Sequence, residues 1–417
     1  MSLAGPSSQK PATKNGGLSP HALEVLLAAA PDRTNTQNNL PSAESSQSHV
    51  LSLPPLESLV EQDKNQDPKI VADVQFLLDF AVVGFGKCGT TSLLHWLQQK
   101  DNTTETTTGT LVRAPNYEAQ FLRNKRPAQL VRKMYQFGVE EQEARNNNKL
   151  LPHEKIVKGF KNPSDIRRPK SRDLLTQYWP QTKLIVTVRH PVEWMVSLYN
   201  YFKIEKGRHK ATLTAADMVT PGARDKEGDT QHFVSSAKGE FHAILAEIGK
   251  TPLASTDEWK LLRPWLNPSQ KVRIQKHHMP HSIFLMEMKQ LADTNTTRSK
   301  QFANDLEAFL GLPQNHLPPP LHVRPNTQRV KGQDNLEDLK MDICAPEFAP
   351  VLEEMVSIAR AGSQWLREYF MASPEVTVSS PEYINELFER WMIDPCETSN
   401  GQWIEWRTNV CSSKHHF

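Results

Sequence analysis

Short runs of apolar residues alternate with segments of helical periodicity through the middle of the chain. Lys183–Val188 is an almost continuous apolar run, which is typical of a parallel strand covered on both faces. Phe80–Val83, Lys155–Phe160 and Ile283–Met286 resemble it. Helical stripes follow, for example Leu93, Leu94, Trp96 and Leu97, and later the long stripe over 349–370. The alternation predicts an α/β fold with a central, mostly parallel sheet.

The two ends of the chain differ from this middle part. Residues 1–68 are rich in Ser, Pro, Asn, Gln and Thr and have little periodicity, so we expect a disordered segment. We assign 69–375 to one folded domain and 376–417 to a helical and irregular C-terminal extension.

Composition excludes several classes of protein. The formal net charge of the 417 residues is +2, which gives no electrostatic case for nucleic-acid binding. No run of 18 apolar residues occurs, so we expect no transmembrane anchor, and the N-terminus lacks the apolar core of a signal peptide. Nothing in the composition indicates an oligomeric state.

Four cysteines are present, and no Cys or His spacing suggests zinc, so we expect no metal. Cys88 is expected to fill space inside a loop. Cys396 and Cys411 flank a Trp-containing segment and could pair in an oxidising compartment, but spacing alone leaves this open.

The stretch after the first apolar run is rich in glycine and is the main candidate for chemistry. Its sequence is Gly-Phe-Gly-Lys-Cys-Gly-Thr-Thr-Ser, over 84–92. A strand, a glycine-rich turn and a helix N-terminus together form an anion site, to which Lys87 adds a full positive charge.

Three ligands compete for this loop. The three glycines match the dinucleotide pattern GxGxxG, although the region about 20 residues on is polar and shows no second strand. The loop nearly matches the ATP and GTP pattern GxxxxGK[ST], but Thr90 stands where the lysine belongs. The third reading is a phosphosulfate donor loop, in which the lysine lies inside the loop, as Lys87 does here.

Two other positively charged residues follow predicted strands. Lys161 follows Lys155–Phe160, and Arg189 follows Lys183–Val188. Ligands of open parallel sheets bind beyond the carboxyl ends of the strands, so we expect both side chains near the first loop. Glu118 lies among aromatic and apolar residues, and its own sequence context favours a solvated acid.

Taken together, these motifs resemble the sulfotransferases that use 3′-phosphoadenosine 5′-phosphosulfate (PAPS), and the carbohydrate enzymes of the heparan sulfate type most closely. The loop over 84–93 is similar to the family's 5′-phosphosulfate loop. Val188-Arg189-His190-Pro191 with Ser197 is similar to its 3′-phosphate motif. The resemblance covers roughly residues 75–370 and implies a three-layer P-loop-type fold, α/β, with helices flanking the sheet.

The resemblance also assigns roles to individual residues. It implies that Glu118, Lys87 and Lys161 are catalytic, with Glu118 as the base, and it makes PAPS the donor without a metal. It implies a donor site made of Gly86, Lys87, Cys88, Gly89, Thr90, Thr91, Ser92, Arg189, Ser197, Lys331 and Gly332. The family's aromatic-Pro pair after the Lys-Gly segment is missing here.

The predicted function is therefore transfer of a sulfuryl group to an acceptor hydroxyl, on a carbohydrate or a small hydroxylated metabolite. A kinase-like phosphotransferase that uses ATP is one alternative. A non-catalytic glycan-binding scaffold with the donor fold is the other. The carbohydrate enzymes are usually anchored in the Golgi, and because this chain shows no anchor we favour the cytoplasm.

Overall fold

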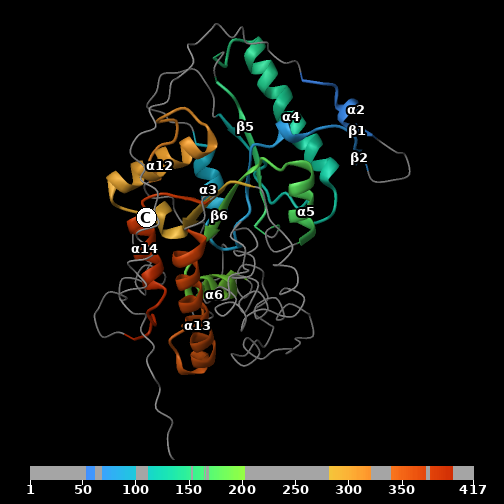
Figure 1. The fold of residues 1–417 in the computed structure, drawn as a ribbon. Coiled ribbons are helices and arrows are strands. Elements are labelled where there is room, and N and C mark those ends of the chain that lie inside the picture. Colours follow the sequence, from blue (N-terminus) through green and yellow to red (C-terminus); the bar gives the residue numbers. More distant parts are fainter. Residues whose placement is uncertain are drawn as a thin grey trace, which may run out of the picture. The chain divides into compact units, whose positions relative to one another are not determined.

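A six-stranded sheet forms the centre of the protein (Figure 1). The computed structural model describes residues 53–61, 68–99, 111–151, 154–163, 165, 169–201, 281–320, 340–371 and 376–397. Lys331, Gly332 and Cys411 lie outside the described residues, as does most of the N-terminal segment that we expected to be disordered.

The strands of the sheet lie in the order β4-β5-β3-β6-β7-β8, and each pairs with its neighbours in parallel. The first strand of the sheet, β3, thus lies in the middle, and later strands add on both of its sides. In sheets with such an order, ligands bind beyond the carboxyl ends of the strands, which here means beyond the end of β3. The strands are β3 (Phe80–Val82), β4 (Val112–Arg113), β5 (Val157–Lys161), β6 (Lys183–Val188), β7 (Ile283–Glu287) and β8 (Val376–Val378).

Helices cover both faces of the sheet. Alternate strand residues point to opposite faces, and the buried apolar residues accordingly form two clusters. Phe80 and Val82 pack with α3 (Thr90–Leu97) and α12 (Thr296–Leu310). Ala81 lies in the other cluster, with residues of α4 (Pro127–Asn146), α5 (Pro169–Tyr178), α6 (Pro191–Asn200), α13 (Ala349–Trp365) and α14 (Pro381–Arg390).

The predicted fold class is confirmed. The protein has an α/β, three-layer P-loop-type fold, in which helices flank a central sheet whose six strands are all parallel. The four predicted strands are present within one or two residues of their expected limits. The strands that sequence reasoning missed, β4 and β8, are edge strands of two and three residues.

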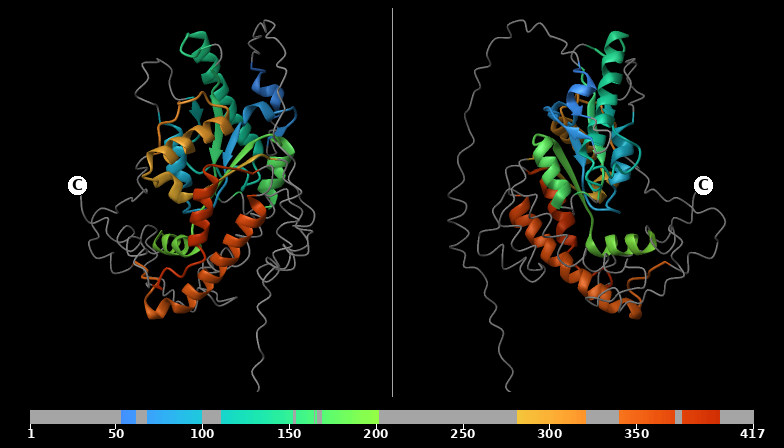
Figure 2. Two further views of the ribbon diagram at one scale, coloured as in Figure 1. Left: turned by 60° about the vertical axis from the view of Figure 1, so that its left-hand side comes forward. Right: turned by 90° about the vertical axis from the view of Figure 1, so that its right-hand side faces the viewer.

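Local sequence explains where the helices around the sheet begin and end. Pro191 is the first residue of α6, and the His190 side chain accepts a hydrogen bond from the Val192 N–H at 3.2 Å. Gly311 ends α12 in the left-handed conformation, with φ of 78°. Figure 2 shows α6, in light green, just beyond the strand that precedes it, with the long α13 beside it.

Residues 53–61 correct the boundary that we placed at residue 68. They contain the short helix α2 (Leu56–Leu59) and the strand β1 (Val60–Glu61), which pairs with β2 (Lys69–Ile70) in an antiparallel ribbon. Leu59 and Val60 are buried in the core. The apolar residues here are few and lie within a polar stretch, so the hydrophobic pattern was too weak to predict this element. Between β2 and β3, the chain forms one 3₁₀ turn, η1 (Gln75–Leu77).

The disulfide differs from the pairing that we considered. Cys396 is bonded to Cys344, 52 residues earlier, and therefore cannot pair with Cys411. Cys344 lies just before the turn η8 (Pro346–Phe348) that leads into α13, and Cys396 follows α14. After α13 the chain continues through a π-helical turn, η9 (Leu366–Phe370). Disulfides are typical of oxidising compartments, which counts against the cytoplasmic location that we favoured.

Candidate active site

The glycine-rich loop follows β3 and lies against the end of β6. The Val83 N–H donates to the Ile185 carbonyl at 3.1 Å, and the Phe85 N–H donates to the Thr187 carbonyl at 3.3 Å. A Cβ atom at Gly84 would lie 2.2 Å from Thr187 Oγ1, so only glycine fits there. A Cβ atom at Gly86 would meet nothing within 4 Å, which leaves open space beside this residue.

The helix that follows the loop begins at a glycine. Gly89 is the N-cap of α3 with φ of 79°, and its carbonyl accepts from the Leu93 N–H at 2.8 Å. The first N–H groups of a helix have no acceptor within the helix, and the helix dipole adds partial positive charge there. A glycine cap has no side chain with which to accept them. The start of α3 is therefore suited to bind an anion.

Lys87 stands at the turn of the loop. Its backbone also has a positive φ, 65°, which is uncommon for a residue with a side chain. The Lys87 Nζ atom lies 4.3 Å from the centre of the Tyr201 ring, just after α6. This cation–π contact holds the lysine on the side of the loop that faces α6.

Lys161 links the head of α3 to Glu118. It is the last residue of β5, and its side chain is only 5% exposed. Its Nζ atom donates to Thr91 Oγ1 at 2.7 Å and lies 3.9 Å from Glu118 Oε1. The Ala119 N–H donates to the Lys161 carbonyl at 3.0 Å, which fixes the segment that carries Glu118. Glu118 itself is about half exposed.

Arg189 holds the loop from the side of β6. Its Nη1 atom donates to the Lys87 carbonyl at 3.4 Å, and its Nε donates to Glu193 Oε2 at 3.3 Å. Trp194 Nε1 donates to the Gly86 carbonyl at 2.9 Å. Two side chains around the start of α6 thus fix consecutive carbonyl groups of the loop.

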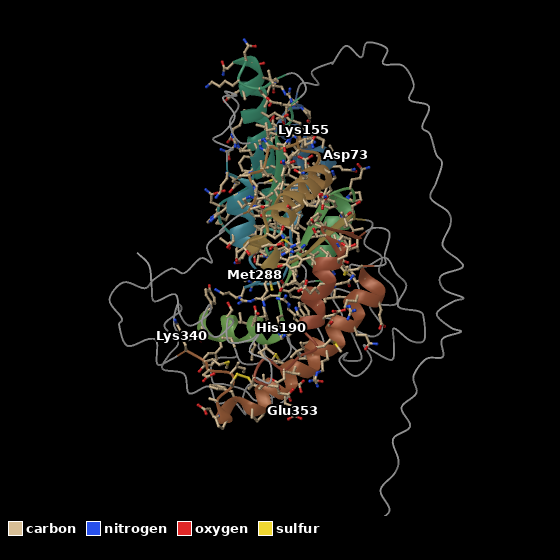
Figure 3. The ribbon with its side chains drawn as sticks, turned by 90° about the vertical axis from the view of Figure 1, so that its left-hand side faces the viewer. Asp73, Lys155, His190, Met288, Lys340 and Glu353 are labelled. Carbon is tan, nitrogen blue, oxygen red and sulfur yellow. A yellow bond between two sulfur atoms is a disulfide. The ribbon has the colours of Figure 1, made fainter. Side chains whose placement is uncertain are left out.

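A third element supports the loop from β7. The 3₁₀ turn η6 (Met288–Ala292) follows this strand, and Glu287 caps it by accepting from the Lys289 N–H at 2.6 Å. A Cβ atom at Gly89 would lie 2.9 Å from Met288 Cγ. Figure 3 shows His190 and Met288 at the carboxyl end of the sheet, whereas Lys155 lies near its other end.

Burial and neighbouring charge shift several pKa values at this edge of the sheet. Burial acts to raise the pKa of Glu193, but Lys289 and Arg189 outweigh it and hold that pKa at about 2. Burial raises the pKa of Glu287 to about 7. Burial also lowers the pKa of Lys161, and Glu118 opposes this effect. The Cys88 thiol is fully buried, which raises its pKa far above the usual range, so it stays protonated and fills space.

The structure brings together most of the residues that the sequence singled out. The loop 84–92, Lys161, Glu118 and Arg189 meet at one edge of the sheet. Ser197 lies farther along α6, six residues after its first residue Pro191, a rise of about 9 Å along the helix. It is half-buried.

Sequence reasoning missed three charged residues of this edge, Glu193, Glu287 and Lys289. Glu193 had a signal, because Arg and Glu four residues apart lie on one side of a helix. Glu287 had one as well, because it directly follows the predicted strand Ile283–Met286, whereas Lys289 had none. Their place depends on the pairing of β7 with β6, which sets Glu287 beside Val188.

Neither a metal site nor a membrane-spanning helix is present among the described residues. This part of the chain contains no group of three His, Cys, Asp or Glu side chains that could hold a metal ion. None of its helices is both long and apolar enough to cross a membrane.

Comparison with known proteins gave a distant structural likeness. No family model and no curated protein matches the chain. Among solved structures, the crystal structure of a sulfotransferase from Alicyclobacillus acidocaldarius is 16% identical, over 69% of this chain and 96% of that chain, with a TM-score of 0.32. A likeness this distant establishes neither a family nor an activity.

Proposed function

We propose that this protein is a sulfotransferase that moves a sulfuryl group from PAPS to an acceptor hydroxyl. One observation carries the proposal. The Lys161 Nζ atom lies 2.7 Å from Thr91 Oγ1 at the head of α3 and 3.9 Å from the Glu118 carboxylate. An anion site and a carboxylate that can accept a proton thus share one buried cation.

The residues present fit the donor. A donor with several phosphate and sulfate oxygens needs open space beside backbone N–H groups, and the empty position beside Gly86 offers such a cradle. Lys87, Lys161 and Arg189 supply positive charge on three sides of the loop. When bound, the donor supplies the sulfuryl group as an activated mixed anhydride.

Each residue then has a definite task. When the bond between the sulfuryl group and the donor's 5′-phosphate breaks, Lys87 and the N–H groups of Gly89, Thr90 and Thr91 would stabilise the negative charge left on that phosphate, and adenosine 3′,5′-bisphosphate would be released. Lys161 holds the oxygens of the group to be transferred. Glu118 takes the proton of the acceptor hydroxyl, and its exposure leaves room for an acceptor.

The second half of the donor site belongs to Arg189 and Ser197. The planar guanidinium of an arginine suits a phosphate because it can donate two hydrogen bonds at once. In this proposal both residues bind the 3′-phosphate. Cys88 and Ser92 complete the loop around the 5′ side. The acceptor is a carbohydrate or a small hydroxylated metabolite.

Donor selectivity is the first test. We expect isothermal titration calorimetry to show that adenosine 3′,5′-bisphosphate binds more tightly than ATP or NAD, without added metal. Tighter binding of ATP, together with a requirement for Mg²⁺, would instead support the kinase-like alternative.

Glu118→Gln tests the base. Labelled sulfate is followed from the donor to a panel of glycans and small alcohols, and the best acceptor is used. We expect turnover to fall by about 10²–10⁴ while donor affinity stays nearly unchanged, because the amide cannot take up the proton. Glu353→Gln, at an exposed position on α13, is the matched control. Near-normal turnover of E118Q would show that Glu118 is not the base, and donor binding without transfer to any acceptor would support a scaffold.

A further inference from the structure

A buried carboxylate lies beside the arginine that is proposed to bind the 3′-phosphate. Glu193 is 3% exposed, and its Oε2 atom accepts from Arg189 Nε at 3.3 Å. Burial of both side chains removes most of the water that would screen this pair. Taken alone, the carboxylate would cancel much of the attraction of Arg189 for a phosphate.

Lys289 offsets that carboxylate from the opposite side. Its Nζ atom lies 2.7 Å from Glu193 Oε1, while Arg189 contacts the other oxygen. The three side chains together therefore keep a net charge of one positive unit. Lys289 comes from η6, on the neighbouring strand connection, and its side chain is about one-third exposed.

The same turn is fixed tightly by its neighbours. Gln290 donates to the Ser379 carbonyl at 3.0 Å, and its Oε1 atom accepts from the Glu287 N–H at 3.0 Å. Met288 packs against Gly89 of the loop. Lys289 is therefore held by a rigid turn that also touches the head of α3.

From this geometry we infer that Lys289 is a positioning residue for the donor's 3′-phosphate. Lys289 offsets the negative charge of Glu193, so that the attraction between Arg189 and the phosphate is not cancelled. Glu193 in turn holds the Arg189 guanidinium where it donates to the Lys87 carbonyl. The inference rests on the proposed function.

The test measures preference for the 3′-phosphate. The probes are adenosine 3′,5′-bisphosphate and 5′-AMP, which differ only in that group, and preference is the ratio of their dissociation constants. Lys289→Met should lower the preference by about tenfold or more, because charges a few Å apart interact by more than the free energy of a tenfold change. Affinity for 5′-AMP should change little.

A second variant separates compensation of charge from damage to the fold. In the double variant E193Q/K289M no carboxylate remains to neutralise Arg189, so most of the lost preference should return. Lys155→Met is the matched control, because Lys155 also pairs with a carboxylate, that of Asp79, but lies at the other end of the sheet. The K155M variant should show the same preference for the 3′-phosphate as the wild type. If K289M does not fold, K289Q, which lacks the charge but keeps an N–H donor, replaces it.

The outcomes separate the two proposals. If the wild type shows no preference for the 3′-phosphate, the proposed function fails, and this inference fails with it. If the wild type shows the preference but K289M keeps it, only the inference is refuted. The same holds if the double variant restores nothing, or if K155M loses as much as K289M.

Discussion

Two glycines of the loop should respond in opposite ways to the same substitution. A Cβ atom at position 84 would lie 2.2 Å from Thr187 Oγ1 and 2.4 Å from the Thr187 backbone nitrogen. A Cβ atom at position 86 would meet nothing within 4 Å, and the backbone of Gly86 is not in the left-handed region. Gly84→Ala is thus a test of packing, and Gly86→Ala is a test of ligand space.

The magnitudes follow from these distances. An ordinary contact of a Cβ atom is 3.4–4 Å, so Gly84→Ala must move the loop or the end of β6 by roughly 1 Å or more. Overpacking of this kind costs about 1–3 kcal/mol, and we expect about 3 because the obstructing atoms include buried backbone. Gly86→Ala should leave stability unchanged or raise it by about 0.4–1 kcal/mol, since alanine restricts the unfolded chain.

Urea unfolding and calorimetry distinguish the two variants. Tryptophan fluorescence measures unfolding in urea. Calorimetric titration with adenosine 3′,5′-bisphosphate measures how well the space beside Gly86 accepts the ligand. Gly86→Ala should lower the affinity for this ligand without lowering the free energy of unfolding, because the new methyl group occupies the open space. A Gly84→Ala variant as stable as the wild type would refute the close approach of the loop to β6. Unchanged binding by Gly86→Ala would refute the cradle.

Two other predictions concern stability. Burial raises the pKa of Glu287 from 4.5 to about 7, so the folded protein binds this proton more tightly than the unfolded chain does. The stabilisation that results is full below pH 4.5 and is lost as the pH rises through about 7. The effect amounts to roughly 3 kcal/mol. Glu287→Gln should therefore reduce, by about that amount, the difference between the free energies of unfolding measured in urea at about pH 5 and about pH 8. An equal pH dependence in the wild type and in E287Q would contradict this prediction. Replacing Cys344 and Cys396 with serine should lower the free energy of unfolding by about 4 kcal/mol, because the bond closes a loop of 52 residues. Reaction of both cysteines with a thiol reagent before reduction would show that the bond is absent.

Sequence patterns predicted the elements whose signals are local. The apolar run over 183–188 was found with its limits unchanged, as β6, and Pro191 and Gly311 mark the helix ends that they predicted. The same patterns missed α4 and α5, whose exposed faces are rich in charged residues, and β4 and β8, which are too short for a period to show. The N-terminal ribbon was missed for the same reason.

The candidate site divides in the same way. Lys87, Lys161 and Arg189 were found because each follows an apolar run, and the carboxyl ends of parallel strands meet at one edge of a sheet. Glu118 was found only through a resemblance, since no local pattern separates it from a solvated acid. The structure places it 3.9 Å from Lys161, but its role stays a prediction.

Contacts between distant segments were decided by the tertiary structure. Strand order brings Lys289 to Glu193, presses Gly84 against Thr187 and joins Cys344 to Cys396 rather than leaving Cys396 for Cys411. Periodicity and glycine spacing are properties of a few consecutive residues, so they can be read along the chain. A charge pair or a disulfide depends on which strands lie side by side, and that is settled only when the whole sheet packs its two faces.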